Sequence, residues 1–296
     1  MKRISSIFKS SLTLLFLIAT LFGAGAQNPV ELKLWPNGSA GSNGLTGDEM
    51  VSEDGIISNV TNPSIIVFRP SKPNGIAIIM CPGGSYIRLA INHEGYDMAS
   101  WFNALGVTYI ILKYRMPNGH PEIPLSDAEQ AMRVVRAHAA EWGVDPHRVG
   151  IMGASAGGHL AASLATLFTS DETRPDFQIL LYPVISMSPD STHAVSRREL
   201  IGGNASKELE IKYSLERQVS STTPQAFIAL SADDKTVPPS NGISYFSALL
   251  GCDVPATLHV YPFGRHGWGF RDSFKYKRQW TGELEKWLFD GVEWSD

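Results

Sequence analysis

Short apolar runs alternate with longer helical patterns along most of this 296-residue chain. Runs that are too short for helices predict strands, namely Ser64–Phe68, Ile76–Met80, Val107–Leu112, Val149–Met152, Ile179–Tyr182, Ala226–Leu230 and Thr257–Tyr261. Helical patterns cover Ser126–Trp142, Ala156–Phe168, Pro239–Leu250 and Ser273–Phe289. Strands that alternate with helices imply an α/β fold, in which helices cover both faces of a mostly parallel central sheet.

Two details of this pattern are further predictions. Ser126 is followed three residues later by Glu129, which is the spacing of a capping box and predicts a helix start at Ser126. Between Ser186 and Thr222 the pattern turns polar and irregular. We interpret residues 186–222 as an insertion at the rim of the sheet that forms a partial lid, with an ordinary long crossover as the alternative.

The first 26 residues have the pattern of a secretory signal peptide. Basic residues precede the apolar run Leu12–Phe22, and the small residues Ala24-Gly25-Ala26 follow it. A retained membrane anchor is the alternative, but the run falls short of the ~20 residues that span a bilayer. We therefore expect a secreted or periplasmic protein without stable membrane insertion, whose single domain covers residues 27–296.

Composition and cysteine spacing argue against nucleic-acid binding and against a zinc site. The chain is 43% hydrophobic and carries a formal charge of −4, so it can bury a core and nucleic acid is not an expected partner. The two cysteines, Cys81 and Cys252, are expected to be free thiols, and their spacing does not suggest a zinc site.

The strongest motif is Gly153-Ala154-Ser155-Ala156-Gly157, which lies between a predicted strand and a predicted helix. A serine on such a turn stands exposed above the sheet, and small neighbours let the backbone turn tightly. The N–H groups at the start of the helix face developing negative charge. This context predicts that Ser155 is a nucleophile and that Ala156 donates one hydrogen bond to an oxyanion.

A nucleophilic serine needs a base and an orienting acid, which follow it in this order along the chain in such folds. His266 lies in a glycine-flanked loop after the last predicted strand, and it is the predicted base. The predicted acid is one of two neighbours, Asp233 or Asp234, because both come just after the strand Ala226–Leu230. The remaining oxyanion donors are expected at Gly83 and Gly84, a glycine pair that follows a strand.

Together these segments resemble the α/β-hydrolase superfamily, and more narrowly the secreted bacterial carbohydrate esterases that include acetylxylan esterases and feruloyl esterases. The matching stretches are PGGSY (82–86), HEG (93–95), LKYR (112–115), GASAGGHL (153–160), DDKTVP (233–238) and HGWG (266–269). In this family the acid lies four residues before the proline of a Val-Pro pair, which implies Asp234. The resemblance also implies that Gly83, Gly84 and Ala156 form the oxyanion hole. Pro82 and Ser85 depart from the His-Gly-Gly-Gly form, so the inward-facing amide is left open among Gly83, Gly84 and Ser85.

The resemblance implies a serine carboxylesterase that needs no cofactor and removes acyl groups, acetyl first, from a plant polysaccharide such as acetylated xylan. Tyr86 and Trp268 are candidates for a sugar platform, although either ring also suits the core. A feruloyl esterase is the main alternative. A serine peptidase and a non-catalytic carbohydrate-binding protein on the same scaffold are weaker ones.

Overall fold

The computed structural model describes residues 28–39 and 41–292. Within these ranges the main sheet has eight strands in the order β1-β4-β7-β5-β8-β9-β10-β11. Their bounds are β1 (Val30–Lys33), β4 (Ser64–Phe68), β7 (Thr108–Lys113), β5 (Gly75–Cys81), β8 (Val144–Ala154), β9 (Gln178–Leu181), β10 (Ala226–Ser231) and β11 (Ala256–Tyr261). Pairing is antiparallel from β1 to β7 and parallel from β7 to β11, so the predicted α/β class with a mostly parallel sheet is confirmed.

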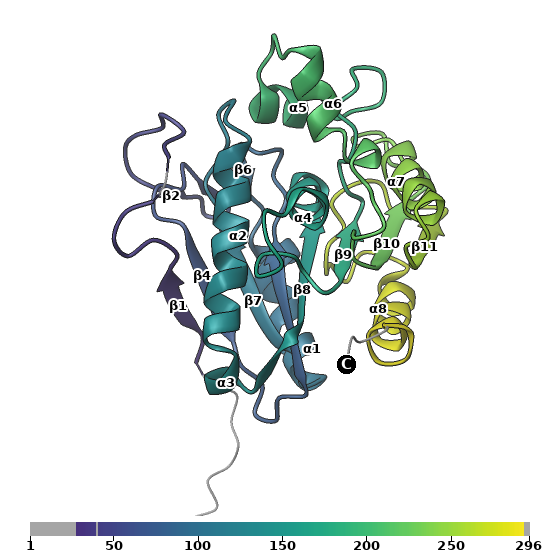
Figure 1. Ribbon diagram of the computed structural model, residues 1–296. Helices are drawn as coiled ribbons and strands as arrows, with labels where there is room; N and C mark the ends of the chain where they lie inside the picture. Colours follow the sequence, from purple (N-terminus) through teal and green to yellow (C-terminus); the bar gives the residue numbers. More distant parts are fainter. Residues whose placement is uncertain (1–27, 40, 293–296) are drawn as a thin grey trace, which may run out of the picture.

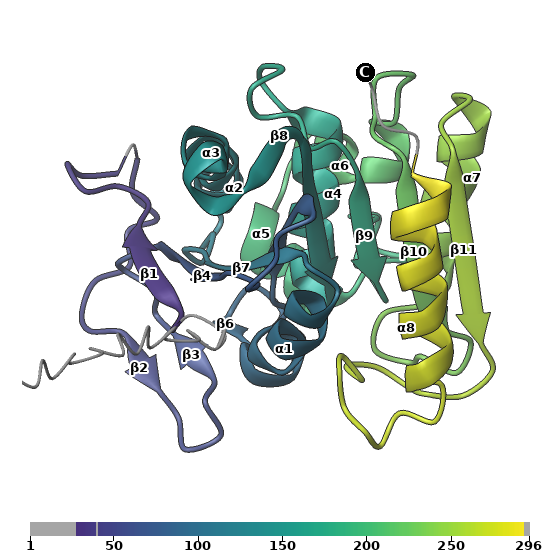
Figure 2. The same ribbon diagram turned by 90° about the horizontal axis from the view of Figure 1, so that it is seen from below.

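Helices cover both faces of this sheet (Figure 2). One side carries α1 (Asp97–Ala104) and α8 (Lys277–Lys286), and the other carries α2 (Glu122–Ala137), α4 (Ser155–Leu167) and α7 (Ser240–Gly251). A strand covered on both faces has no solvated side, which explains why β5, β10 and the second half of β8 (residues 149–154) are almost continuous apolar runs. The parallel strands end at one edge, where the motifs of the sequence meet.

The predicted capping box at Ser126 is wrong. Helix α2 begins at Glu122 after Pro121, and Ser126 lies inside it with its hydroxyl donating to the Ile123 carbonyl at 2.7 Å. The Glu129 carboxylate instead accepts hydrogen bonds from the amide and hydroxyl of Thr169. Proline suits the start of a helix because its missing N–H would have no partner there. The single helix predicted over Ser126–Trp142 is two helices in the structure, because α2 ends at Ala137 and α3 (Ala139–Trp142) follows it.

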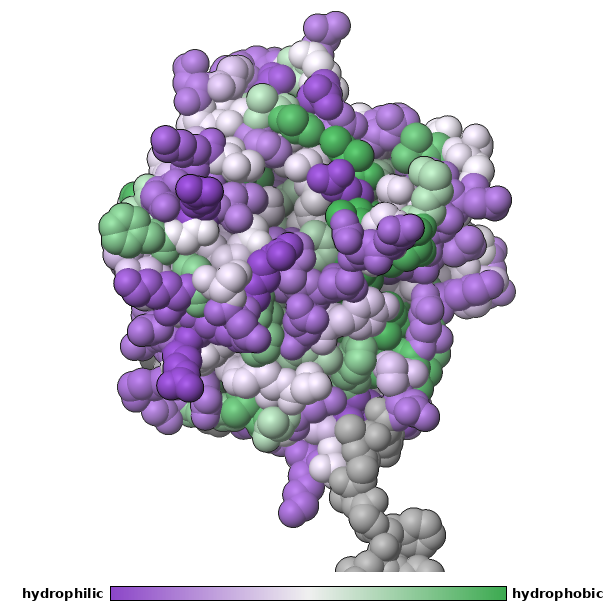
Figure 3. Space-filling model, turned by 180° about the vertical axis from the view of Figure 1, so that it is seen from behind, coloured by the Kyte–Doolittle hydropathy of each residue, from purple (hydrophilic) through white to green (hydrophobic). Residues whose placement is uncertain are grey.

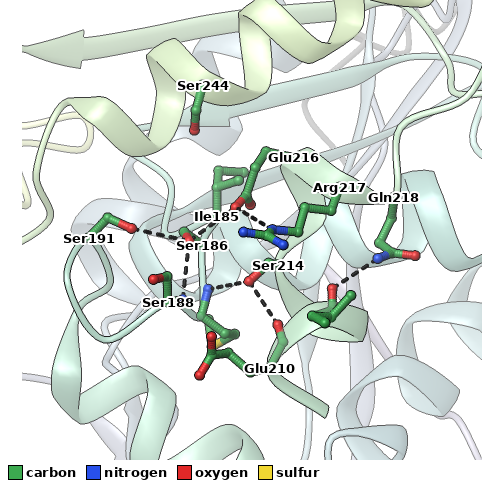
Figure 4. Close-up of polar contacts among 12 residues, drawn as sticks. Ile185, Ser186, Ser188, Ser191, Glu210, Ser214, Glu216, Arg217, Gln218 and Ser244 are labelled. Carbon is green, nitrogen blue, oxygen red and sulfur yellow. Dashed lines mark hydrogen bonds and ion pairs between the residues drawn. The ribbon is translucent and has the colours of Figure 1, made fainter. Parts of the chain in front are cut away.

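The predicted irregular segment 186–222 contains regular structure. It forms α5 (Ala194–Ile201), α6 (Lys207–Tyr213) and a 3₁₀ turn (Leu215–Arg217), and Figure 1 places α5 and α6 beyond the sheet. Polar contacts hold its two ends together (Figure 4). The Ser186 hydroxyl donates to Glu216 at 3.1 Å, and the Ser214 hydroxyl accepts from the Met187 amide at 2.9 Å. The insertion is therefore a structured unit with a fixed base.

Several small elements complete the fold. A three-stranded sheet is formed by β2 (Met50–Val51), β3 (Ile57–Ser58) and β6 (Arg88–Leu89), and a π-helical turn (Asn92–Tyr96) leads into α1. A second π-helical turn (Trp287–Gly291) ends the described chain. Hydrophilic side chains dominate the face in Figure 3, with apolar ones in small groups between them.

Three other expectations concern the whole chain. No helix in the described ranges is long and apolar enough to cross a membrane. Cys81 is buried, Cys252 is half-buried, and both are free thiols. The expected signal peptide, residues 1–26, lies outside the described residues.

Candidate active site

Ser155 occupies the sharp turn between β8 and α4. Its φ of 54° lies in the left-handed region, which is uncommon for a residue with a side chain and is characteristic of a functional constraint. The flanking glycines are required by close contacts. A Cβ on Gly153 would lie 2.1 Å from the carbonyl oxygen of Gly157, and a Cβ on Gly157 would lie 2.0 Å from that of Cys81. The turn can therefore pass between its neighbours only with glycine on both sides.

His266 reaches this serine from the loop after β11. Its Nε2 lies 2.8 Å from the Ser155 Oγ, and its Nδ1 lies 2.6 Å from the Asp234 Oδ2. With the proton on Nδ1 donated to Asp234, Nε2 is free to accept the serine proton. The structure thus brings Ser155, His266 and Asp234 into one hydrogen-bonded chain. Order in the sequence predicted Ser155 and His266 and left the acid open between Asp233 and Asp234, of which the family resemblance implied Asp234.

The two neighbouring aspartates have different partners. The second oxygen of Asp234 accepts hydrogen bonds from the amides of Thr236 at 2.9 Å and Val237 at 3.0 Å. Asp233 turns the other way, and its Oδ1 accepts from the amides of Gly264 and Arg265 at 2.9 and 2.7 Å. Asp234 therefore contacts the imidazole, whereas Asp233 ties the end of β10 to the loop that carries His266.

The oxyanion side of the site differs in one respect from the prediction. The Gly83 amide donates to the Glu94 carboxylate at 2.8 Å, so it is not free to bind an oxyanion. Within the described chain, no such bond occupies the amides of Gly84 or Ser85. Gly84 has a φ of 135°, and a Cβ there would lie 2.0 Å from the Arg88 carbonyl oxygen, which explains why glycine is needed. Gly84 remains a candidate donor together with Ala156 at the start of α4.

Glu94 and Tyr182 connect the glycine loop to the histidine loop, and sequence reasoning missed both. Glu94 is buried, and its Oε1 accepts from the Tyr182 hydroxyl at 2.8 Å. The same hydroxyl accepts from the Gly269 amide at 2.8 Å. The Tyr182 ring meets the His266 imidazole edge-on, with centroids 4.9 Å apart. The only sequence signal for this bridge was the His-Glu-Gly stretch at 93–95.

The proposed sugar platform is not supported. Tyr86 is 1% exposed and donates its hydroxyl to His159 at 3.0 Å, and Trp268 is 3% exposed and stacks on Phe274. Neither ring is open to a ligand. His159 is a packing residue, because its Nε2 donates to the Tyr213 carbonyl oxygen at 2.8 Å and burial lowers its pKa to about 4.

The insertion borders the site through His193. This residue precedes α5, and its pKa is lowered by burial first and then by the nearby His266. The surface beside His266 is hollowed by two cavities of about 510 and 530 Å³, and residues of the segment 263–266 line both of them. Among the described residues, no group of three or more His, Cys, Asp or Glu side chains is arranged to hold a metal ion.

Comparison with known proteins agrees with this geometry. A family model described as the alpha/beta hydrolase fold matches residues 78–269. An acetylxylan esterase of Xylanibacter ruminicola is 41% identical over 78% of this chain and 49% of its own length. An endo-1,4-beta-xylanase B of Butyrivibrio fibrisolvens is 35% identical over 64% of this chain and 32% of its own length. The chain therefore spans half or less of these curated relatives.

A solved structure is similar along most of its length. The crystal structure of an acetyl ester-xyloside bifunctional hydrolase from Caldicellulosiruptor lactoaceticus is 34% identical, with a TM-score of 0.75, and the match covers 88% of this chain and 95% of that chain. The fold, the arrangement around Ser155 and these similarities lead to one conclusion. The chain belongs to the α/β-hydrolase fold family, and within it the chain resembles the acetylxylan esterases.

Proposed function

We propose that this protein is a serine carboxylic-ester hydrolase that removes acetyl groups from xylan or a related plant polysaccharide. The observation that carries the proposal is the hydrogen-bonded chain from the Ser155 Oγ through His266 to Asp234. A buried carboxylate, an imidazole and a serine at these distances are the arrangement that acyl transfer requires. The similarity to an acetylxylan esterase supports the ester as the bond that is cleaved.

The reaction follows from the positions of the groups. His266 accepts the Ser155 proton while the serine oxygen attacks the ester carbonyl, and His266 then gives this proton to the departing sugar oxygen, which leaves as a free hydroxyl. The amides of Ala156 and Gly84 stabilise the oxyanion, and the Glu94 contact holds the loop that carries Gly84. Water, activated by the same histidine, hydrolyses the acetyl-enzyme and restores Ser155.

The substrate assignment depends on the similarities and on the expected signal peptide. The names of both similar proteins, the acetylxylan esterase and the acetyl ester-xyloside bifunctional hydrolase, specify an acetyl group. This favours acetyl over feruloyl groups as the acyl group removed. Export of the chain would bring it to its polysaccharide outside the cytoplasm. We also propose that the insertion 186–222 acts as a partial lid, since its residue His193 lies near His266.

An assay on four substrates tests the function. The mature chain and Ser155→Ala are compared on acetylated xylan, p-nitrophenyl acetate, a feruloyl ester and a peptide amide. We expect acetate release by the wild type and a loss of at least 10³-fold in Ser155→Ala, of the order seen when a catalytic nucleophile is removed. If wild type and Ser155→Ala were equally inert on all four substrates, the proposed hydrolase activity would be wrong and a carbohydrate-binding protein would be favoured instead. Dominant feruloyl release or amide cleavage would replace the acetyl assignment.

A further inference from the structure

The two cavities beside His266 belong to one exposed surface. They share four lining residues, Asp233, Phe263, Arg265 and His266. Phe263 lines both of them with 64% of its surface exposed. Ser155 itself lines neither cavity, but His266 lines both and lies 2.8 Å from the Ser155 Oγ, so a long substrate whose ester group reaches Ser155 can extend past His266 onto this surface.

The charged residues of this surface are mostly cationic. Its basic residues are Lys235, Arg265, Arg271 and Lys275, whereas Asp233 is its only acidic residue. One Asp233 oxygen already accepts two backbone hydrogen bonds. The chain as a whole carries a formal charge of −4, so this excess of positive charge does not reflect the average composition. Charge of one sign at a catalytic opening attracts a substrate of the opposite sign.

These cations lack acidic partners within the described chain. No ion pair involves Lys235, Arg265 or Lys275 there, and Arg271 instead donates to the His93 Nδ1 at 3.2 Å. The nearby acid Asp272 pairs with Lys277 at 2.7 Å and does not line either cavity. The guanidinium of Arg265 therefore has its planar set of donors available, which matches a carboxylate in shape and charge.

We propose that this cationic surface binds a carboxylate of the ester substrate. The proposal rests on the ester hydrolysis proposed above and narrows its substrate class. The carboxylate has two possible sources, a uronic acid unit of the acetylated saccharide or the free acid of a dicarboxylic acyl group. Several separated cations suit the first source better, because a saccharide chain extends over a wider surface than one acyl group.

The test compares matched substrates that differ in a carboxylate. Acetylated xylo-oligosaccharides that carry glucuronic acid are assayed beside the same mixture after an α-glucuronidase has removed it. The acyl arm compares p-nitrophenyl hydrogen succinate with p-nitrophenyl butyrate, whose acyl group has the same number of carbons and no carboxylate. We expect kcat/KM to be roughly three- to tenfold higher on the acidic oligosaccharides, and to lose this preference at high salt because exposed charges are screened.

The variants identify the residues responsible. In Arg265→Gln/Lys275→Gln the preference should disappear while hydrolysis of p-nitrophenyl acetate is retained. Arg278→Gln, an exposed cation on α8 outside both cavities, should keep the preference. A preference confined to the succinate ester would support the carboxylate site with the acyl group as its source. Equal kcat/KM on all matched pairs would overturn this inference, whereas no acetate from either saccharide would overturn the proposed function itself.

Discussion

At the scale of single residues, neighbours in sequence have different roles because their backbones point them in different directions. Asp233 and Asp234 both follow β10, and spacing alone left them as alternatives. Asp234 bonds His266, and Asp233 bonds the amides of Gly264 and Arg265. The two aspartates differ only in the direction of their side chains. That direction depends on contacts with residues about 30 positions away in sequence, so spacing within the motif does not reveal it.

Substitution of each aspartate should separate these roles. Asp234→Asn keeps the size of the side chain but removes the charge that orients and stabilises the imidazolium, so kcat on p-nitrophenyl acetate should fall by roughly 10³–10⁴. Asp233→Asn retains an acceptor for the loop amides, so kcat should change by less than about tenfold. Steady-state kinetics on both variants decides the assignment, and the reverse order of effects would make Asp233 the acid.

The Tyr182 hydroxyl gives a second prediction at this scale. Tyr182→Phe removes the bond to Glu94 and the acceptor for Gly269, which loosens the link between the glycine loop and the histidine loop. We expect kcat to fall about tenfold with KM nearly unchanged, because the bridge positions catalytic groups without touching substrate.

Tyr245→Phe is the matched control for this change. Tyr245 of α7 is also buried, and its hydroxyl donates to Gln178 of β9 at 3.1 Å, away from Ser155. Loss of that bond should lower stability by about 1 kcal/mol and leave kcat unchanged. If both variants lost stability alone, Tyr182 would have a structural role only.

At the scale of elements, the buried strands were predictable and the edges were not. The apolar runs of β5, β10 and the second half of β8 follow from burial on both faces, and β4 agrees with its prediction at both ends. Strands β2, β3 and β6 have two residues each, which is too short for any periodicity. The predicted start of α2 at Ser126 is wrong because the Ser-x-x-Glu spacing also occurs inside a helix, whereas the helix begins after Pro121.

The site shows the same limit. Ser155 and His266 could be predicted because strong local motifs surround them. Glu94 could not, because its partners Gly83 and Tyr182 lie 11 and 88 residues away in sequence and meet it only after folding. That contact also removes the Gly83 amide from the predicted oxyanion donors.

Asn241 of α7 gives a prediction about the insertion. Its buried side chain accepts from the amides of Ile185 and Ser186 at 3.0 Å and donates to the Ser191 carbonyl at 2.8 Å. Asn241→Ala leaves two buried amides without acceptors, so the free energy of unfolding should fall by about 2–4 kcal/mol. Urea denaturation measures this loss, and limited proteolysis should detect faster cleavage within 186–222.

Asn241→Asp is the control for that experiment. The carboxylate keeps acceptors for both amides, but it replaces the donor with a buried negative charge beside the Ser191 and Pro238 carbonyl oxygens, so it should retain only part of the lost stability. Slower proteolysis within 186–222 in Asn241→Asp than in Asn241→Ala would show that the acceptor holds the start of the insertion, and equally fast proteolysis would contradict this.

At the scale of the whole molecule, stability should depend on pH through His159. Burial lowers the pKa of this imidazole to about 4, whereas an unfolded histidine titrates near 6.5. The unfolded chain therefore binds the extra proton first as the pH falls. Above about pH 6.5 the neutral His159 contributes about 3 kcal/mol to the free energy of unfolding, relative to low pH. This contribution is lost progressively as the pH falls from about 6.5 to about 4.

Urea denaturation between pH 7.5 and 4.5 measures this slope. His159→Gln removes the titrating group and keeps side-chain donors and acceptors near Tyr86 and Tyr213. We expect the variant to be less stable at pH 7.5 and to lose less stability on acidification than the wild type. Parallel slopes in the two proteins would assign the pH dependence to other groups.

One loop carries both the base and much of the surface that a substrate must meet. His266, Phe263 and Arg265 are separated by no more than three residues, and the same segment is tied to Asp233 and, through Gly269, to Tyr182. A change that moves the backbone of this loop would therefore tend to disturb the base as well, whereas exchange of an exposed side-chain end would not. Among relatives that act on different substrates, sequence differences should consequently concentrate in the insertion 186–222, where side chains that contact substrate can change without moving His266.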